Sequence, residues 1–230
     1  MLKIFILAGG FGTRLSKIVK DVPKPMASIN GTPFLDYVVN NIQKDIPNSP
    51  IYILTHYKSE IIERHFKKMN KINILREETP LGTGGALKNA IYSLNIKYND
   101  SVLVLNGDTY VECNYHEFIK NSKKTINILT KFKENCDRYS TMTIEDNLIK
   151  KFNKPGIIKK PSYINTGSYY FKQVDTIINF KKNRFMIEEL FDQNYMENEI
   201  SSYLIDDYFI DIGTPEDYIT FCETMKNDNR

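Results

Sequence analysis

The sequence predicts an α/β protein in which helices flank a mostly parallel β-sheet, with a small antiparallel β portion in the second half. Three observations lead to this fold class. Short apolar runs alternate with amphipathic stretches through the first half, which is the pattern of a parallel sheet covered on both faces. Glycine or an Asn-Gly pair ends the first and fourth runs, as at the end of a buried strand. In the second half, successive β-like runs replace that alternation, and they are typical of antiparallel strands.

The elements of the first half follow the alternation in order. We expect buried strands at the short apolar runs and helices in the amphipathic stretches between them. Thr32 and Pro33 suit the start of the first helix, and Ser59 with Glu60 suits the amino end of the second. The predicted elements are strand Ile4–Leu7, a helix from Phe34, strand Ile51–Leu54, helix Ser59–Phe66, strand Ile72–Leu75, helix Ala86–Leu94 and strand Val102–Leu105.

The second half is predicted to be rich in strands. Its predicted elements are strands 126–132, 140–144, 148–152 and 163–171, helices 174–178 and 187–194, strand 209–213 and a helix opened by Thr214, Pro215, Glu216 and Asp217. No linker-like stretch separates the halves, so we expect one domain over residues 1–230. Motif-like segments follow the first, third and fourth strands. Because ligands bind beyond the carboxyl ends of parallel strands, we expect a Rossmann-like binding site there.

Composition and charge disfavour several classes of partner. At 230 residues the chain can bury roughly 70–75% of the surface that it exposes when unfolded. Its formal charge is +3 and its 31 basic residues are scattered, whereas a nucleic-acid-binding protein concentrates them on one surface. No apolar window reaches the length of a membrane span, and Cys113, Cys136 and Cys222 lack the spacing of a zinc site or a disulfide framework. We therefore expect a cytoplasmic protein without a nucleic-acid or membrane partner.

The glycine-rich segment after the first strand suggests an anion site. Gly10-Phe11-Gly12-Thr13-Arg14 lacks the third glycine of a dinucleotide fingerprint and the Lys-Ser/Thr of a P-loop. Glycines still let backbone N–H groups converge on a phosphate, and the Arg14 guanidinium offers it a fork of donors. The segment is either such a phosphate loop or a tight turn with a surface arginine.

Lys24 stands between Pro23 and Pro25, and the prolines restrict the backbone on both sides. This is an unusual frame for a solvated lysine and a suitable one for a charge directed at a ligand. An exposed loop lysine is the alternative interpretation.

Six short motifs, taken together, resemble the sugar-phosphate nucleotidyltransferase family. They are Gly9–Leu15 (GGFGTRL), Pro23–Met26 (PKPM), Pro80–Leu87 (PLGTGGAL), Leu105–Asp108 (LNGD), Asn165–Gly167 (NTG) and Asp211–Tyr218 (DIGTPEDY). They occur in the family's order and span nearly the whole chain. Within the family, the PLGTGGA and NGDT runs are most similar to the D-glycero-D-manno-heptose 1-phosphate guanylyltransferases, although Thr79 stands where those enzymes usually have glutamate.

The resemblance implies a reaction and a division of the chain. Members of the family join a sugar 1-phosphate to a nucleoside triphosphate and release pyrophosphate, with Mg²⁺ as cofactor. Residues 1–112 are then mainly the nucleotide-binding half and residues 113–230 mainly the sugar-phosphate-binding half. The most similar members imply GTP and D-glycero-α-D-manno-heptose 1-phosphate as substrates, and GDP-heptose for a surface polysaccharide such as capsule or lipopolysaccharide. A homodimer is an open expectation, since homodimers are common.

The resemblance also implies roles for individual residues. Arg14 and Lys24 would be the catalytic cations, and Asp108 and Asp211 the metal ligands, unless these two are a turn aspartate and a helix cap. The positions implied for the nucleotide are Leu7, Ala8, Gly9, Gly10, Gly12, Thr13, Arg14, Lys24, Glu77, Pro80, Leu81, Gly82, Thr83, Asn106, Gly107 and Asp108. Those implied for the sugar phosphate are Lys154, Asn165, Thr166 and Gly167, although Asn153 stands where the family commonly has glutamate.

The implied chemistry needs cations rather than a general base. The attacking sugar phosphate has a second pKa of about 6 and is already ionised near neutral pH. The reaction then requires that two anions are aligned and that the developing charge is neutralised. His56, His65 and His116 are accordingly interpreted as structural or surface residues.

Glu77 is predicted to recognise the base of the nucleotide. Guanine offers two adjacent donors, N1–H and N2–H₂, which one carboxylate can accept together, whereas uracil and thymine suit a glutamine amide better. Glu77 stands where thymidylyl and uridylyl relatives have glutamine, and Glu78 is the competing candidate. The alternatives left open are a hexose 1-phosphate enzyme of the same family, a nucleotide-binding regulatory module without catalysis, and a dehydrogenase, which the missing third glycine disfavours.

Overall fold

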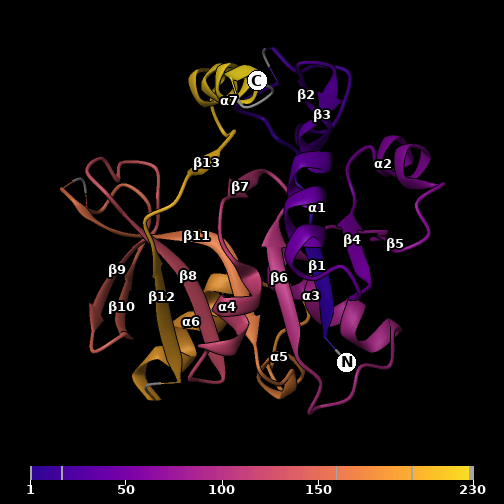
Figure 1. The fold of residues 1–230 in the computed structure, drawn as a ribbon. Coiled ribbons are helices and arrows are strands. Elements are labelled where there is room, and N and C mark those ends of the chain that lie inside the picture. Colours follow the sequence, from indigo (N-terminus) through magenta and orange to yellow (C-terminus); the bar gives the residue numbers. More distant parts are fainter. Residues whose placement is uncertain (1, 17, 159, 198, 228–230) are drawn as a thin grey trace.

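Residues 2–16, 18–158, 160–197 and 199–227 are described by the structure, a computed structural model. Among them, a nine-stranded sheet forms the centre of the molecule, which confirms the α/β class (Figure 1). From one edge to the other its strands are β5 (Ile72–Arg76), β4 (Ile51–Thr55), β1 (Lys3–Leu7), β6 (Val102–Asn106), β11 (Ser162–Phe171), β8 (Ile126–Lys133), β12 (Ile200–Ile205), β10 (Leu148–Asn153) and β9 (Thr141–Glu145). Two short pairs stand apart from it, β2 (Ser28–Ile29) with β3 (Thr32–Pro33) and β7 (Thr109–Val111) with β13 (Phe209–Asp211).

The strands of the second half extend the parallel sheet. β5, β4, β1 and β6 run parallel to one another. β11 then runs antiparallel between β6 and β8, and β12 returns parallel to β8. The hairpin of β9 and β10 closes the far edge in antiparallel fashion. The predicted antiparallel portion is therefore present, but it continues the main sheet instead of forming a separate one.

Helices cover both faces of the sheet (Figure 1). One face carries α1 (Phe34–Asp45), α2 (Ser59–Phe66) and α4 (Tyr115–Lys120), whose buried apolar residues belong to one hydrophobic cluster. α7 (Pro215–Asn227) adds Phe221 and Met225 to this cluster but packs against β13 and β2, beyond the main sheet (Figure 1). The other face carries α3 (Gly82–Ser93), α5 (Asp175–Ile178) and α6 (Ile187–Asn194), which contribute to a second cluster. The short turns η1 (Lys24–Met26) and η2 (Tyr195–Glu197) complete the elements. In the described ranges, no helix has the length and apolar character that crossing a membrane requires.

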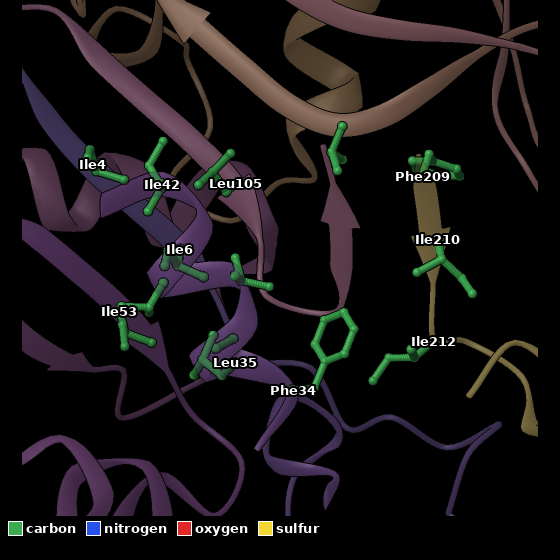
Figure 2. Packing of buried hydrophobic residues seen from close by; sticks show 14 of the residues in the cluster. Ile4, Ile6, Phe34, Leu35, Ile42, Ile53, Leu105, Phe209, Ile210 and Ile212 are labelled. Atoms are coloured by element: carbon green, nitrogen blue, oxygen red, sulfur yellow. The ribbon is translucent and has the colours of Figure 1, made fainter. Parts of the chain in front are cut away.

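Alternation along β1 divides the core into its two layers. Ile4 and Ile6 point into the cluster under α1, whereas Phe5 belongs to the cluster under α3. This follows because successive side chains of a strand point to opposite faces. In Figure 2, Ile4 lies beside Ile42, and Ile6 lies between Ile42 and Leu35, both of which belong to α1. A strand that is buried on both faces is apolar throughout, and this explains why the run was recognisable in the sequence.

Five strands and helices were not predicted, namely β2, β3, β7, α4 and β12. In addition, α3 begins at Gly82 rather than at Ala86, and β13 ends at Asp211 rather than at Gly213. β12 has the mixed run Ile200-Ser201-Ser202-Tyr203, in which the buried Ser201 hydroxyl donates to Asn127 Oδ1 at 2.6 Å. The sequence does not reveal that the hydroxyl of such a serine has a hydrogen-bond partner inside the protein. The backbone N–H groups of Gly84 and Gly85 both donate to Phe185 O at 3.1 Å, so a distant carbonyl stabilises the glycine-rich start of α3.

Candidate active site

A cavity of about 750 Å³ opens where β1 and β6 end. All the residues predicted to bind the nucleotide line this cavity except Gly107, whose N–H donates to Leu7 O at 2.9 Å behind it. The wall also includes residues that the sequence did not single out: Phe11, Leu15, Pro25, Leu54, His56, Ala86, Arg184, Phe185, Met186, Glu189 and Gly213. The fold thus assembles segments from both halves of the chain around one space.

The glycine-rich loop lies directly against Lys24. Gly12 has φ of +60°, and a Cβ built on it would be only 2.7 Å from Lys24 Cβ, so an L side chain would be strained and would collide there. The loop can therefore approach the lysine closely. Arg14 is exposed, and in the described part of the chain its guanidinium has no hydrogen bond or ion pair. Its donors are available to an anion in the cavity.

Lys24 joins two aspartates that are distant in the sequence. Its Nζ lies 2.7 Å from Asp108 Oδ2 and 3.2 Å from Asp211 Oδ1. The lysine side chain is only 9% exposed, so the alternative of an exposed loop lysine is excluded. Pro23 and Pro25 flank it in the turn η1. Two of the three ammonium hydrogens can be used by these carboxylates, and one remains.

Pairing of β13 with β7 brings Asp211 close to Lys24 and Asp108. Asp211 is opposite Thr109, the residue after Asp108. Its neighbours Ile210 and Ile212 are buried in the hydrophobic cluster that contains Phe34 (Figure 2), so the backbone on both sides of the carboxylate is fixed. Burial, and then the nearby charge of Asp108, raise the pKa of Asp211, while Lys24 lowers it. The helix-cap interpretation of Asp211 does not hold, because Thr214 Oγ1 accepts from Asp217 N at 3.2 Å at the start of α7.

Asp108 and Asp211 suit a magnesium ion only if the substrate supplies further ligands. Within the described ranges, no group of three or more His, Cys, Asp or Glu side chains could hold a metal ion alone. Mg²⁺ binds through one or two carboxylates and takes its other ligands from phosphates and water. The donor set of Asp108 and Asp211 has that composition.

Glu77 faces the cavity and Glu78 does not. Glu77 is on the cavity wall, while Glu78 is exposed and absent from it. Glu77 N donates to Thr55 O at 2.8 Å, and its Oε2 accepts from Leu81 N at 3.3 Å. Burial raises the pKa of Glu77, while the Leu81 N–H and the charge of His56 lower it. His56, expected to be structural or on the surface, also lines the cavity, and its Nδ1 lies 3.0 Å from Glu77 O.

The segment before α6 completes the wall, and the sequence analysis missed it. Phe185 N donates to Leu81 O at 2.9 Å, and Ile187 N donates to Thr83 Oγ1 at 2.9 Å. The buried Lys88 ammonium donates to Phe180 O at 2.7 Å and to Lys182 O at 3.3 Å. These bonds hold Arg184, Met186 and Glu189 at the cavity. In the sequence, the basic run around Arg184 resembles a solvated surface, so only the fold shows that this run lies at the cavity.

The four residues predicted for the sugar phosphate do not line the cavity. Lys154 is exposed after β10. Asn165 donates from Nδ2 to Tyr169 Oη at 3.0 Å and accepts from Gly167 N at 2.8 Å. Thr166 is a correction: it is 1% exposed and its hydroxyl donates to Leu129 O at 2.7 Å, so it does not face a sugar. Gly167, at φ of +80°, leaves room for Asn106, whose Nδ2 would be 2.4 Å from an added Cβ.

Known proteins resemble this chain in sequence and in fold. The family model for nucleotidyl transferases matches residues 3–228. A Campylobacter jejuni protein named D-glycero-alpha-D-manno-heptose 1-phosphate guanylyltransferase is 36% identical, over 96% of this chain and 98% of its own length. A protein of the same name from Aneurinibacillus thermoaerophilus is 31% identical, over 94% and 95%. The crystal structure of HddC from Yersinia pseudotuberculosis complexed with GMP-PN has a TM-score of 0.83 and 32% identity, over 98% of this chain and 100% of that one. The chain therefore belongs to the nucleotidyl transferase family and is a nucleotidyltransferase.

Proposed function

We propose that this protein joins GTP and D-glycero-α-D-manno-heptose 1-phosphate to give GDP-heptose and pyrophosphate. The observation that carries the proposal is the convergence of Arg14, Lys24 and Asp108 on one cavity, with the Glu77 carboxylate on its wall. The names of the Campylobacter and Aneurinibacillus relatives support the heptose. The GMP-PN complex of the Yersinia protein supports a guanine nucleotide.

The proposed reaction is an in-line displacement at the α-phosphorus of GTP. An oxygen of the sugar phosphate forms a bond to that phosphorus, while the bond from the phosphorus to the oxygen bridging to the β-phosphate breaks. Pyrophosphate leaves with the electron pair of the broken bond. Since the attacking oxygen is ionised near neutral pH, no general base is required, and the protein acts by aligning and neutralising the two anions.

The cations of the site have separate tasks in this mechanism. The N–H groups of the Gly10–Thr13 segment and the Arg14 guanidinium would hold the β- and γ-phosphates. The remaining ammonium hydrogen of Lys24 would donate to the α-phosphate, where the charge is redistributed, because the other two are directed to Asp108 and Asp211. Mg²⁺, held by these two aspartates, would supply a Lewis-acid charge on the phosphate oxygens when bound.

Glu77 would select guanine. Its carboxylate lies at the cavity and keeps acceptor capacity beyond the bond from Leu81 N, so it can accept from N1–H and N2–H₂ of guanine. The backbone of Leu81 and Gly82 would support the base at the start of α3.

A substrate matrix tests the proposal. Pyrophosphate release is followed for GTP, ATP, UTP and dTTP, each with heptose, mannose and glucose 1-phosphates, in the presence of Mg²⁺. The expected result is the fastest turnover with GTP and the heptose. Faster turnover with UTP or dTTP would contradict the guanine assignment. Faster turnover with mannose 1-phosphate would make that sugar the substrate instead of the heptose. If no pair releases pyrophosphate, the protein is a nucleotide-binding module without catalysis.

The cellular setting follows from the proposed chemistry. We place the reaction in the cytoplasm, where nucleoside triphosphates are made, and GDP-heptose would then supply capsule or lipopolysaccharide synthesis. The homodimer remains a prediction, and sedimentation of the purified protein would test it.

A further inference from the structure

His56 lies between the two segments of the cavity wall to which the proposed function assigns the base and the phosphates of the nucleotide. It follows β4, and β4 lies between β5 and β1 in the sheet. Glu77, proposed to bind the base, follows β5, and the glycine-rich loop, proposed to hold the phosphates, follows β1. All three line the same cavity. Since the ribose of a nucleotide joins its base to its phosphates, a nucleotide bound in this way would have its ribose beside His56.

Contacts on both sides fix the His56 ring at the cavity wall. On the side of the base, its Nδ1 lies 3.0 Å from Glu77 O. On the side of the phosphates, it meets the ring of Phe11 edge to face, with the ring centroids 6.0 Å apart and the planes at 84°. A Cβ built on Gly9 would lie 3.4 Å from His56 Cβ, so the backbone of the loop passes directly beside the histidine. The ring therefore spans the distance between the two segments.

The contact with Glu77 O decides which nitrogen of the ring is free. A carbonyl oxygen can only accept a hydrogen bond, so Nδ1 carries the hydrogen and donates it. Nε2 of the neutral ring is then an acceptor. In the described part of the chain, no hydrogen bond involves this nitrogen. Because His56 is half-buried and lines the cavity, a bound ligand can supply the missing donor.

GTP has two kinds of hydrogen-bond donor to offer. The donors of guanine, N1–H and N2–H₂, are those proposed to bind the Glu77 carboxylate, which leaves the 2′- and 3′-hydroxyls of the ribose. We propose that His56 Nε2 accepts a hydrogen bond from one of these two hydroxyls, which makes His56 a specificity-determining residue for the ribose. The inference rests on the proposed function. The bond would also survive protonation of the ring, because the hydroxyl oxygen can then accept from Nε2–H.

Two substitutions separate the tasks of the two ring nitrogens. Asparagine places its amide nitrogen near the position of Nδ1, so His56→Asn retains a donor for Glu77 O and loses the acceptor for the ribose. Glutamine places its amide near the position of Nε2, so His56→Gln retains an acceptor oxygen for the ribose and loses the donor for Glu77 O. His116→Asn is the matched control, because His116 is exposed on α4 and does not line the cavity.

The assay follows pyrophosphate release from GTP, 2′-deoxy-GTP, 3′-deoxy-GTP and ITP, each with the sugar 1-phosphate that gives the fastest turnover. With the wild type and His116→Asn, we expect kcat/KM to be about 3–10-fold lower for one deoxynucleotide than for GTP, which corresponds to one hydrogen bond. His56→Asn should lose the same factor with GTP and no longer distinguish that deoxynucleotide, whereas His56→Gln should still distinguish it. ITP lacks the guanine N2–H₂ group, and its disadvantage should be the same in the wild type and in His56→Asn.

Three results would overturn the inference. If His56→Asn distinguishes the deoxynucleotides as the wild type does, another group binds the ribose. If His56→Gln loses the discrimination and His56→Asn keeps it, the histidine acts only by holding the backbone of Glu77. If His56→Asn changes the disadvantage of ITP instead, the histidine binds the guanine amine.

Calorimetric binding of the nucleotides separates this inference from the proposed function. If the wild type releases no pyrophosphate but binds GTP more tightly than one deoxynucleotide, and His56→Asn binds the two equally, the reaction is wrong and the inference stands. If the wild type turns over GTP and both deoxynucleotides equally well, the inference is wrong and the reaction stands. A wild type that binds no GTP contradicts both.

Discussion

Lys24 Nζ lies 2.7 Å from Asp108 Oδ2, although 84 positions separate the two residues in the sequence. The lysine comes from a turn enclosed by prolines and the aspartate from the turn that follows the central strand β6. Asp211 accepts from the same ammonium at 3.2 Å. The ion pair therefore ties three motifs of the chain together at the point where the transferred phosphate would react.

Removal of the Lys24 ammonium should destabilise the protein in a pH-dependent way. In Lys24→Met, Asp108 and Asp211 lose the ammonium that binds both of them. We expect the free energy of unfolding near neutral pH to fall by about 2 kcal/mol, below the range for a fully buried pair, because Asp108 is 37% exposed and the charge of Arg138 still acts on Asp211. The loss should shrink as the pH falls through the raised pKa of Asp211, because that carboxylate then takes up a proton. It should grow as the pH rises and Asp211 ionises. Urea denaturation at several pH values measures this.

The same variant should release pyrophosphate at least about 100-fold more slowly. Lys24→Arg is the matched control: it retains the charge and should recover much of the stability, but its planar fork differs from an ammonium and should not restore the rate. A Lys24→Met protein as stable as the wild type at pH 8 would show that the two aspartates do not depend on the lysine.

Glu77→Gln should reduce the preference for GTP over dTTP by about 10-fold or more, since a hydrogen bond to a charged group contributes about 1.5–3 kcal/mol. Glu78→Gln, at an exposed position away from the cavity, should leave the preference unchanged. kcat/KM for each triphosphate is the measurement, and a larger effect of the Glu78 variant would assign the base to that residue instead.

Glu77 should also make the binding of GTP weaker at acidic pH. Because burial raises its pKa above the ordinary value of 4.5, the carboxylate takes up a proton and loses acceptor capacity as the pH falls through that raised value. KM for GTP should then increase toward acid pH, and this increase should be absent in Glu77→Gln. An identical pH profile in both proteins would show that Glu77 does not titrate in the free enzyme.

Gly167→Ala should cost more than its backbone conformation alone explains. A Cβ at this position would approach Asn106 Nδ2 to 2.4 Å at φ of +80°, whereas at Gly31, with φ of +95°, it would meet nothing within 4 Å. Both alanines carry the strain of a positive φ, roughly 1–2 kcal/mol. The excess loss of unfolding free energy in Gly167→Ala over Gly31→Ala therefore measures the collision, and we expect that variant alone to lose activity, since Asn106 lines the cavity.

Cys113 should react slowly with alkylating reagents. Burial, with Asp45 and Asp207 nearby, raises the pKa of Cys113 to about 12, and the thiolate is the reactive species. At pH 8 we expect alkylation by iodoacetamide to be roughly 1,000-fold slower in the folded protein than in urea, where the thiol has its ordinary pKa of about 8.5. Mass spectrometry of tryptic peptides follows each cysteine, and equal rates in the two conditions would contradict the burial of this thiol.

The strands that the sequence predicted in the first half share one property: their buried residues are apolar. Val102–Leu105 is buried on both faces and was recognised from four consecutive apolar residues. β12 is buried near its polar Ser201, whose partner Asn127 lies on another strand, so its sequence resembled a loop. The start of α3 was missed for a related reason, because three glycines oppose a helix until the carbonyl of Phe185 accepts from two of them.

The sequence by itself determined the α/β class, most of the strands and helices, and the segments that would meet at the carboxyl ends of the strands, because buried parallel strands and glycine-rich turns leave local patterns. Only the tertiary structure decided which side chains share a space. It paired Lys24 with Asp108 and Asp211, chose Glu77 over Glu78 for the cavity wall, removed Thr166 from the site and brought the segment around Arg184 into it. These outcomes depend on contacts between residues far apart in the chain, and burial and pairing of that kind have no local pattern in the sequence.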